Sequence, residues 1–133
     1  MNIARSILPV IAAAFGMAVL GAAAQAPSAL AEVKPGMWEL TGIPGSSAPQ
    51  RLCIADLDRL VRFEHRSQNC TSNVISDEGR STVIGYSCGA AGFGRTRIDV
   101  VTPRNIKVGT QGISGQLPFN YTLTARRVGD CAK

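Results

Sequence analysis

Four cysteines constrain the fold of this chain more than any other feature. They stand at positions 53, 70, 88 and 131, and four cysteines allow three disulfide connectivities. No two of them form a C-x-x-C pair, and the chain has one histidine. This spacing does not favour structural zinc, a thioredoxin-like redox motif or covalently attached haem, so we predict no metal and no cofactor.

The segment between the second and third cysteines favours one connectivity. Strand signals at residues 70–76 and 81–88 flank the turn-forming residues 77–80. A Cys70–Cys88 bridge across this hairpin sets three facing pairs: Ser72 with Tyr86, Val74 with Ile84, and Ser76 with Thr82. The apolar members then share one face, so the bridge and the hydrophobic pattern agree. We therefore predict Cys70–Cys88, which leaves Cys53–Cys131.

The N-terminus has the pattern of a secretory signal peptide. Arg5 is followed by an uncharged run over residues 7–24, and then by the A-x-A sites at residues 24–26 and 29–31. Cleavage after Ala31 is favoured, because cleavage after Ala26 would place Pro27 in the peptidase cleft. The latter site, and retention of the segment as a membrane anchor, are the alternatives.

These features define the predicted domain organisation and location. We predict a signal peptide at 1–31, one disulfide-linked domain at 32–133, and a periplasmic or secreted protein that is not integral to the membrane after cleavage. Oxidising compartments favour disulfides, and a domain of about 100 residues gains much from them because its core is small.

Alternating apolar and polar residues predict a mainly β domain. The expected strands cover residues 37–41, 50–54, 70–76, 81–88, 95–102, 106–110 and 119–125, and a glycine-rich turn covers residues 111–117. A three-residue loop at 103–105 would place Val100 opposite Val108 and Ile98 opposite Thr110. The predicted fold is an antiparallel β meander, a curved sheet or half-barrel, with one short helix and two disulfides.

The helix is expected over residues 56–65. Leu57, Leu60 and Val61 form its apolar stripe. Asp56 is the expected N-cap, and ion pairs are expected from Asp56 to Arg59 and from Asp58 to Arg62. His65 falls in the last turn, where the sequence favours a surface position.

Four segments of the sequence together form a recognisable pattern: Pro35-Gly36-Met37-Trp38-Glu39, Cys53-Ile54, Val83-x4-Cys88 followed by glycines, and Arg126-Arg127-Val128-Gly129-Asp130-Cys131. With them the chain resembles the bacterial exported family called domain of unknown function 3617. The resemblance implies a Gram-negative cell-envelope protein with two disulfides, and it implies no activity, ligand or catalytic residue. Members usually have Thr or Ser two residues after the first cysteine; Ala55 stands there, so the helix start must rely on Asp56.

No pattern in the sequence indicates catalysis. Residues 112–115 match the beginning of the nucleophile-elbow pattern G-x-S-x-G but not its last position. The glycines of residues 89–94 are in the wrong order for a dinucleotide fingerprint. We therefore predict no enzyme and no catalytic residues. Arg95, Arg97 and Lys107 are expected on one sheet face, but without an alternating aromatic residue the pattern does not favour nucleic acid.

The sequence favours a binding module. Its partner would be a hydrophobic small molecule, a lipid or an envelope protein, and the concave sheet would be lined by Trp38, Phe119, Tyr121 and Leu123. For Trp38 itself the sequence favours a core anchor over a pocket wall, and the two roles are compatible. The alternatives are a structural or stress-related envelope protein without a ligand, and a small hydrolase that uses scattered Asp and Glu residues.

Overall fold

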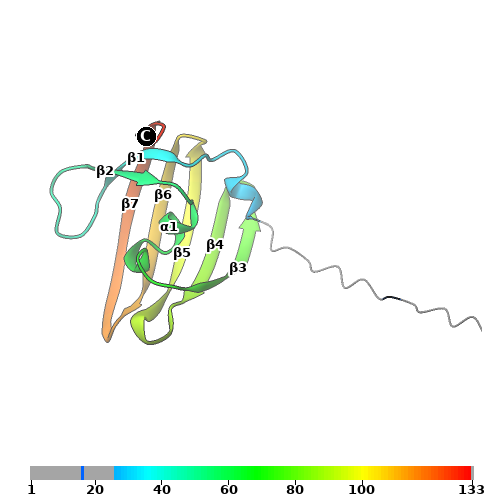
Figure 1. The fold of residues 1–133 in the computed structure, drawn as a ribbon, viewed down its shortest axis with the longest axis vertical. Coiled ribbons are helices and arrows are strands. Elements are labelled where there is room, and N and C mark those ends of the chain that lie inside the picture. Colours follow the sequence, from blue (N-terminus) through cyan, green and yellow to red (C-terminus); the bar gives the residue numbers. More distant parts are fainter. Residues whose placement is uncertain (1–15, 17–25, 133) are drawn as a thin grey trace, which may run out of the picture.

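The protein, described by a computed structural model at residue 16 and residues 26–132, folds into one open antiparallel sheet. Across the sheet the strands are β2 (Gln50–Ile54), β1 (Gly36–Thr41), β7 (Leu117–Gly129), β6 (Asn105–Ser114), β5 (Gly92–Thr102), β4 (Ser81–Ser87) and β3 (Thr71–Glu78). Strands β2 and β3 are its two edges (Figure 1). The predicted mainly β, antiparallel fold with one short helix is confirmed.

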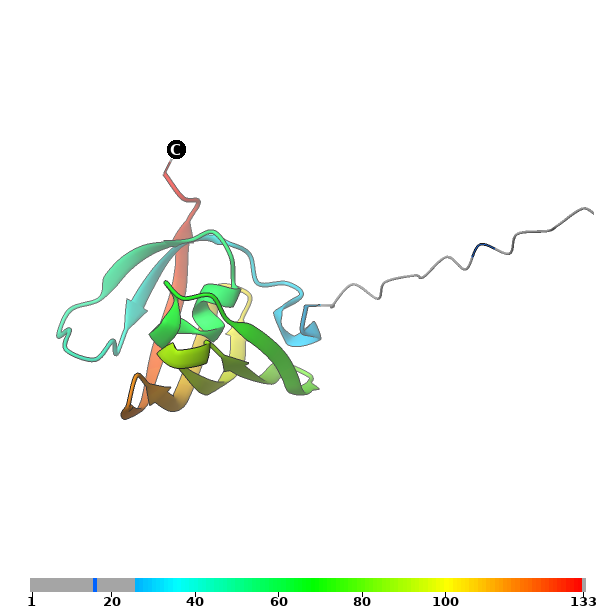
Figure 2. The ribbon, with the colours of Figure 1, turned by 60° about the horizontal axis from the view of Figure 1, so that its bottom comes forward.

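The helical elements over the sheet lie on one side, which we call the inner face (Figure 2). They are η1 (Ser28–Leu30), α1 (Asp58–Val61) and η2 (Phe63–His65), while η3 (Gly89–Ala91) links β4 to β5. Helix α1 contacts β5 and β6, and η2 contacts β6. The opposite side of the sheet is the outer face.

The hydrophobic core lies between the inner face and the α1–η2 segment. Its fully buried apolar side chains include Trp38, Leu40, Leu60, Phe63, Ile98, Ile106, Val108 and Leu123. Burying one such side chain contributes about 1.5–3 kcal/mol, a large share of a typical net stability of about 5–15 kcal/mol. The structure thus places Trp38 as a core anchor.

Both predicted disulfides are confirmed. Cys70–Cys88 closes the open end of the β3–β4 hairpin, and Cys53–Cys131 ties edge strand β2 to the chain that follows β7. The two bonds therefore secure the two edges of the sheet, where strand pairing is otherwise one-sided.

The register of the β3–β4 hairpin differs from the prediction at one end. The first two predicted facing pairs are confirmed, but the third is wrong: Ser76 pairs with Val83, and Thr82 pairs with Asp77. A β-bulge at Ile75 inserts one extra residue into β3 and causes this shift.

The register of the β5–β6 hairpin is also corrected. Val108 pairs with Ile98, and Val100 pairs with Ile106, because the turn takes only residues 103–104 and a β-bulge lies in β5. The difference is two residues. Each side chain therefore keeps its predicted face, since the side-chain period of a strand is two.

The glycine-rich segments around β5 and β6 are strand and not turn. Strand β5 begins at Gly92 and β6 continues to Ser114, so the turn predicted over 111–117 is confined to residues 115–116. A Cβ on Gly112 would lie 2.1 Å from the Phe93 carbonyl oxygen, and one on Gly94 would lie 2.5 Å from the Tyr86 ring. These glycines permit a close approach inside the sheet.

The predicted helix is shorter than expected. After four residues of α1 the backbone leaves the helical region at Arg62 (φ −108°, ψ 44°), and the segment continues as η2. The Asp58–Arg62 ion pair is confirmed at 2.6 Å. Asp56 Oδ1 accepts the Asp58 amide proton at 3.0 Å, so Asp56 does support the helix start although Leu57 is the N-cap residue. No Asp56–Arg59 ion pair forms among the described residues.

The sequence motifs at the two ends of the domain lie side by side. Arg127 on β7 donates a hydrogen bond to the Pro35 carbonyl oxygen at 3.0 Å and forms an ion pair with Asp130 at 2.6 Å. Gly36 has a φ of 154°, and a Cβ there would lie 2.5 Å from the Gly129 carbonyl oxygen. Both motifs therefore belong to one junction between β1 and β7.

The segment before β1 packs on the sheet. Most of the predicted signal peptide, residues 1–15 and 17–25, lies outside the described residues. Residues Ala29 and Leu30 of η1 are buried, and η1 contacts β3, β4 and β5. The Asp77 carboxylate accepts the amide protons of Ser28 and Ala29 at 2.6 and 3.1 Å, and these bonds hold the pKa of Asp77 below its usual value.

Candidate binding site

An apolar pocket opens on the inner face between η1, α1 and the β3–β4 hairpin. Its volume is about 400 Å³. The apolar lining consists of Leu30 from η1, Leu57 and Val61 from the helix segment, and Val74 and Ile84, which pair across β3 and β4. Leu57 and Val61 are four residues apart, so both side chains lie on the helix face that meets the sheet.

The pocket exists because α1 is too short to cover the whole inner face. Helix α1 contacts β5 and β6. Of the described helical elements, only η1 makes extensive contacts with β3. Val74 therefore remains 45% exposed although it points to the apolar side of its strand. Its partner Ile84 is 4% exposed and forms the pocket floor.

The rim of the pocket is polar. Asp56 and Asp58 border it from the helix segment, and Ser72 and Asn73 border it from β3. The carboxylate of Asp58 is already paired with Arg62. An apolar floor inside a polar rim is the usual construction of a site that binds the hydrophobic part of a ligand.

The predicted lining residues lie elsewhere on the inner face. Trp38 and Leu123 are 0% and 1% exposed in the core, so neither has free surface to contact a ligand in this structure. Phe119 and Tyr121 are half-buried, with ring centroids 6.0 Å apart, and Phe119 also lies 5.8 Å from the ring of His65. The structure thus splits the predicted set into a core pair and an aromatic pair.

His65 is buried, in contrast to the surface position expected from the sequence. The residue is only 3% exposed, and both of its ring nitrogens are hydrogen-bonded. Nε2 lies 3.0 Å from the Ala91 carbonyl oxygen and Nδ1 lies 3.1 Å from the Tyr86 hydroxyl. Because a carbonyl only accepts, Nε2 carries the proton in the neutral ring and Nδ1 accepts from Tyr86.

Two further polar pairs connect the helix segment to the sheet. Tyr121 donates its hydroxyl proton to Glu64 at 2.8 Å; burial, and then this bond, raise the pKa of Tyr121 above its ordinary value. Thr96 donates to the Val61 carbonyl oxygen and contacts the Thr110 hydroxyl. In the described part of the chain, no buried side-chain nitrogen or oxygen lacks a partner, so these groups hold the layers together.

Most described carboxylates are engaged in hydrogen bonds or ion pairs. Glu39 is bound by Arg51 and Arg126, and Asp99 is bound by Arg97. These arginines hold the pKa values of both carboxyls below the usual range. Residues 26–132 bring together no group of three potential metal ligands.

Sequence reasoning missed the pocket although it assigned the faces of its residues. The stripe containing Leu57 and Val61, and the facing pair Val74 and Ile84, were both predicted. The missing fact was the length of the helix, because a helix extending to residue 65 would have covered more of the sheet. The irregular backbone at Arg62 has no clear sequence signal.

The fold and the site define a small disulfide-linked domain, an open antiparallel sheet with a partial helical layer on one face. The chain belongs to the family described as "Protein of unknown function (DUF3617)", whose model matches residues 33–131. Comparisons with curated proteins and with solved structures gave no match. Among the described residues, no helix has the length and apolar character required to cross a membrane.

Proposed function

We propose that this protein is a non-catalytic binding module whose inner-face pocket takes the hydrophobic part of a small ligand, such as an acyl chain. The observation that carries the proposal is Val74, an apolar side chain on the inner side of the sheet that remains 45% exposed beside the described helical elements. With residues 26–30 in place, the pocket volume of about 400 Å³ lies within the range typical of small-molecule sites.

The proposal places the module in the periplasm or outside the cell. Two disulfides support a non-cytoplasmic compartment. The burial of His65 supports a binding role over a catalytic one, because both ring nitrogens are bonded inside the protein and neither is within reach of a substrate in the pocket.

The test compares two neighbouring substitutions on β3. Val74→Ser places a polar group in the pocket. Ile75→Ser is the matched control, because Ile75 is similarly exposed at 47% and approaches Gly85 on the outer face. Isothermal titration calorimetry with saturated fatty acids of increasing length should show binding that strengthens with chain length. Val74→Ser should weaken it about fivefold, and Ile75→Ser should leave it unchanged.

Equal effects of the two variants would contradict the pocket as the site. Native mass spectrometry of protein purified from its own cell envelope adds a direct measurement. Bound hydrophobic molecules released by unfolding would support the proposal, whereas apoprotein alone, together with no fatty-acid binding, would favour a structural envelope protein without a ligand.

A partner segment is the second candidate occupant. Strand β3 is a free edge of the sheet, and its residues Ser72, Asn73 and Val74 line the pocket. An extended peptide added to this edge would place alternate side chains over the pocket. Crosslinking from a photoreactive residue at Asn73 in the envelope would distinguish the two, because a peptide partner gives a protein adduct and an acyl ligand gives a lipid adduct.

A further inference from the structure

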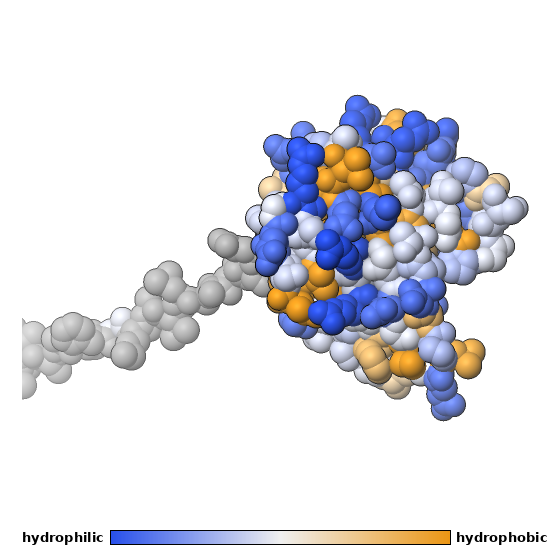
Figure 3. All heavy atoms as spheres, turned by 180° about the vertical axis from the view of Figure 1, so that it is seen from behind, coloured by the Kyte–Doolittle hydropathy of each residue, from blue (hydrophilic) through white to orange (hydrophobic). Residues whose placement is uncertain are grey.

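The outer face of the sheet concentrates the positive charge of the domain. Five basic side chains project from this face, Arg51, Arg95, Arg97, Lys107 and Arg126, against three acidic ones, Glu39, Glu78 and Asp99. In the rest of residues 26–132, seven basic side chains stand against six acidic ones. Figure 3 looks onto the outer face and shows hydrophilic side chains over much of its middle and upper parts, with hydrophobic side chains among them in the upper part.

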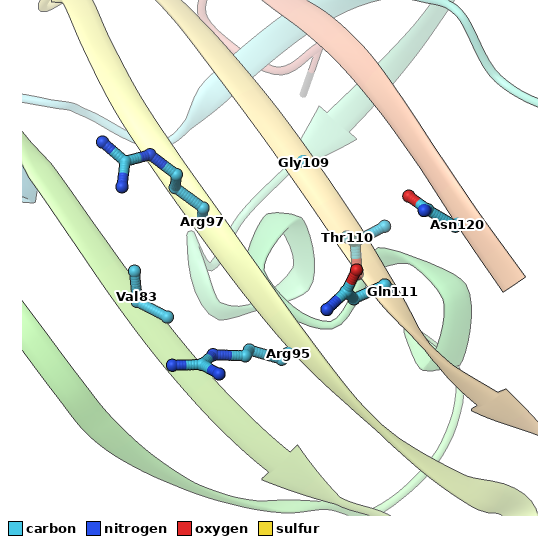
Figure 4. A pocket seen from close by; sticks show the side chains of 7 residues that line it. All are labelled: Val83, Arg95, Arg97, Gly109, Thr110, Gln111 and Asn120. Atoms are coloured by element: carbon cyan, nitrogen blue, oxygen red, sulfur yellow. The ribbon is translucent and has the colours of Figure 1, made fainter.

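A depression of about 410 Å³ lies within this face, on the side of the sheet away from α1 (Figure 4). Arg95 and Arg97, two residues apart on β5, border it together with Gln111 and Asn120 from β6 and β7. Gly109 lies opposite Arg97 and leaves the space above it empty. A Cβ on Gly109 would meet no atom closer than 3.6 Å, so the backbone does not require a glycine there.

The polar groups of the depression suit a phosphate. Arg97 forms an ion pair with Asp99 at 3.0 Å, whereas Arg95 has no ion-pair partner among the described residues. An arginine fork binds phosphate oxygens in bidentate geometry, and the amide groups of Gln111 and Asn120 are further donors. An anion seated here would balance the one unpaired guanidinium of the site.

Apolar side chains follow directly beside these cations. Phe93 is 55% exposed, lies two residues before Arg95 on the same face, and pairs with Ile113 on β6. Ile113 in turn pairs with Pro118 on β7, which is exposed on the same face beside the β6–β7 turn. Figure 3 shows hydrophobic side chains at the lower end of the face, where Figure 1 places this turn. The sequence does not predict this combination, because its strand signal places the start of β5 at residue 95.

We propose that this end of the outer face docks on an anionic phospholipid membrane, with a lipid phosphate on Arg95 and Arg97 and with Phe93 and Pro118 entering the acyl boundary. Cations beside exposed apolar groups are typical of interfacial membrane binding. A nucleic acid would instead require several aromatic platforms along a basic groove, and here a single exposed aromatic ring stands beside aliphatic residues. The surface is separate from the inner-face pocket.

The test measures sedimentation with two kinds of vesicle. We expect the domain to bind vesicles of equal parts phosphatidylcholine and phosphatidylglycerol, and not vesicles of phosphatidylcholine alone. Arg95→Gln should weaken binding about fivefold. Arg126→Gln, which removes the same charge at the far end of the face from a residue paired with Glu39, should have less than half that effect.

A second matched pair tests the apolar contact. Phe93→Ser should weaken binding about tenfold, because the phenyl ring loses its place in the acyl boundary. Val101→Ser should leave binding unchanged, since Val101 is equally exposed on the same strand and face but at its other end. The four substituted side chains, those of Phe93, Arg95, Val101 and Arg126, are all exposed, and thermal melts will confirm that each variant folds.

Three outcomes would overturn the proposal. The first is equal binding to both kinds of vesicle or to neither. The second is equal losses from Arg95→Gln and Arg126→Gln, which would indicate a diffuse charge effect with no site. The third is tighter binding to a single-stranded oligonucleotide than to the anionic vesicles, which would identify the face as a nucleic-acid surface.

Discussion

Removing the two disulfides one at a time separates their contributions to stability. One double variant, Cys53→Ala with Cys131→Ala, opens a loop of 78 residues, and the other, Cys70→Ala with Cys88→Ala, opens a loop of 18 residues. Both disulfides lie at the sheet edges, and replacing either of them leaves the backbone hydrogen bonds between the strands in place. The comparison therefore depends mainly on loop length.

The loop lengths give the expected magnitudes. Loop-closure entropy corresponds to about 4.5 kcal/mol for the longer loop and about 3.2 kcal/mol for the shorter one. Cys88 is only 9% exposed, so its replacement also leaves a small gap in the packing and narrows the difference. Because a domain of this size has about 5–15 kcal/mol of net stability, each loss is a large fraction, and reducing both bonds should unfold or greatly loosen the domain.

Urea unfolding followed by tryptophan fluorescence is the assay. Trp38 is the single tryptophan and has no exposed surface, so its emission reports global unfolding. The free energy of unfolding is extrapolated separately for each variant, because a longer open loop also changes the dependence on urea. A short-loop variant that loses as much stability as the long-loop variant, or more, would refute the entropic argument.

Three further predictions concern single side chains. Thr96→Val should lower the free energy of unfolding by about 1–3 kcal/mol in urea titrations, because the buried Val61 carbonyl oxygen loses its hydroxyl donor. Asp77 has a lowered pKa when folded, so its contribution is present above the unfolded pKa and is lost as the pH falls through the folded value; Asp77→Asn should flatten the stability profile below about pH 4. Tyr121 has a raised pKa, so its contribution is present below about pH 10 and is lost at higher pH; Tyr121→Phe, which also removes the bond to Glu64, should flatten the alkaline slope of unfolding experiments.

The sequence predicted the β fold and the disulfides because strand faces follow a period of two. The register of the β5–β6 hairpin was wrong by two residues, yet every side chain kept its face. The bulge at Ile75 shifted one end of β3, while the pairs near Cys70 and Cys88 were unaffected. Face assignments are therefore robust to the kind of error that turn prediction makes.

The candidate sites were harder to predict because they depend on what covers a face. Trp38, Leu123 and Val74 all carry the same alternating signal in the sequence. Trp38 and Leu123 are nevertheless buried under the helical layer, whereas Val74 lies beyond it. Glycines added a second difficulty. Gly94 and Gly112 resemble turn residues in the sequence, whereas in the fold they admit neighbouring groups that a Cβ would exclude.

If the predicted signal peptide is cleaved, the packing of η1 makes the cleavage site decisive for the shape of the pocket. Leu30 forms one wall of it, and the two amides of η1 engage Asp77. A peptidase that cuts after Ala31 would remove that wall and leave the mature protein with a wider, more open trough. A cut after Ala26 would keep the wall and give a new N-terminus at the mouth of the pocket. The mass of the mature chain therefore decides between a closed and an open form of the same domain.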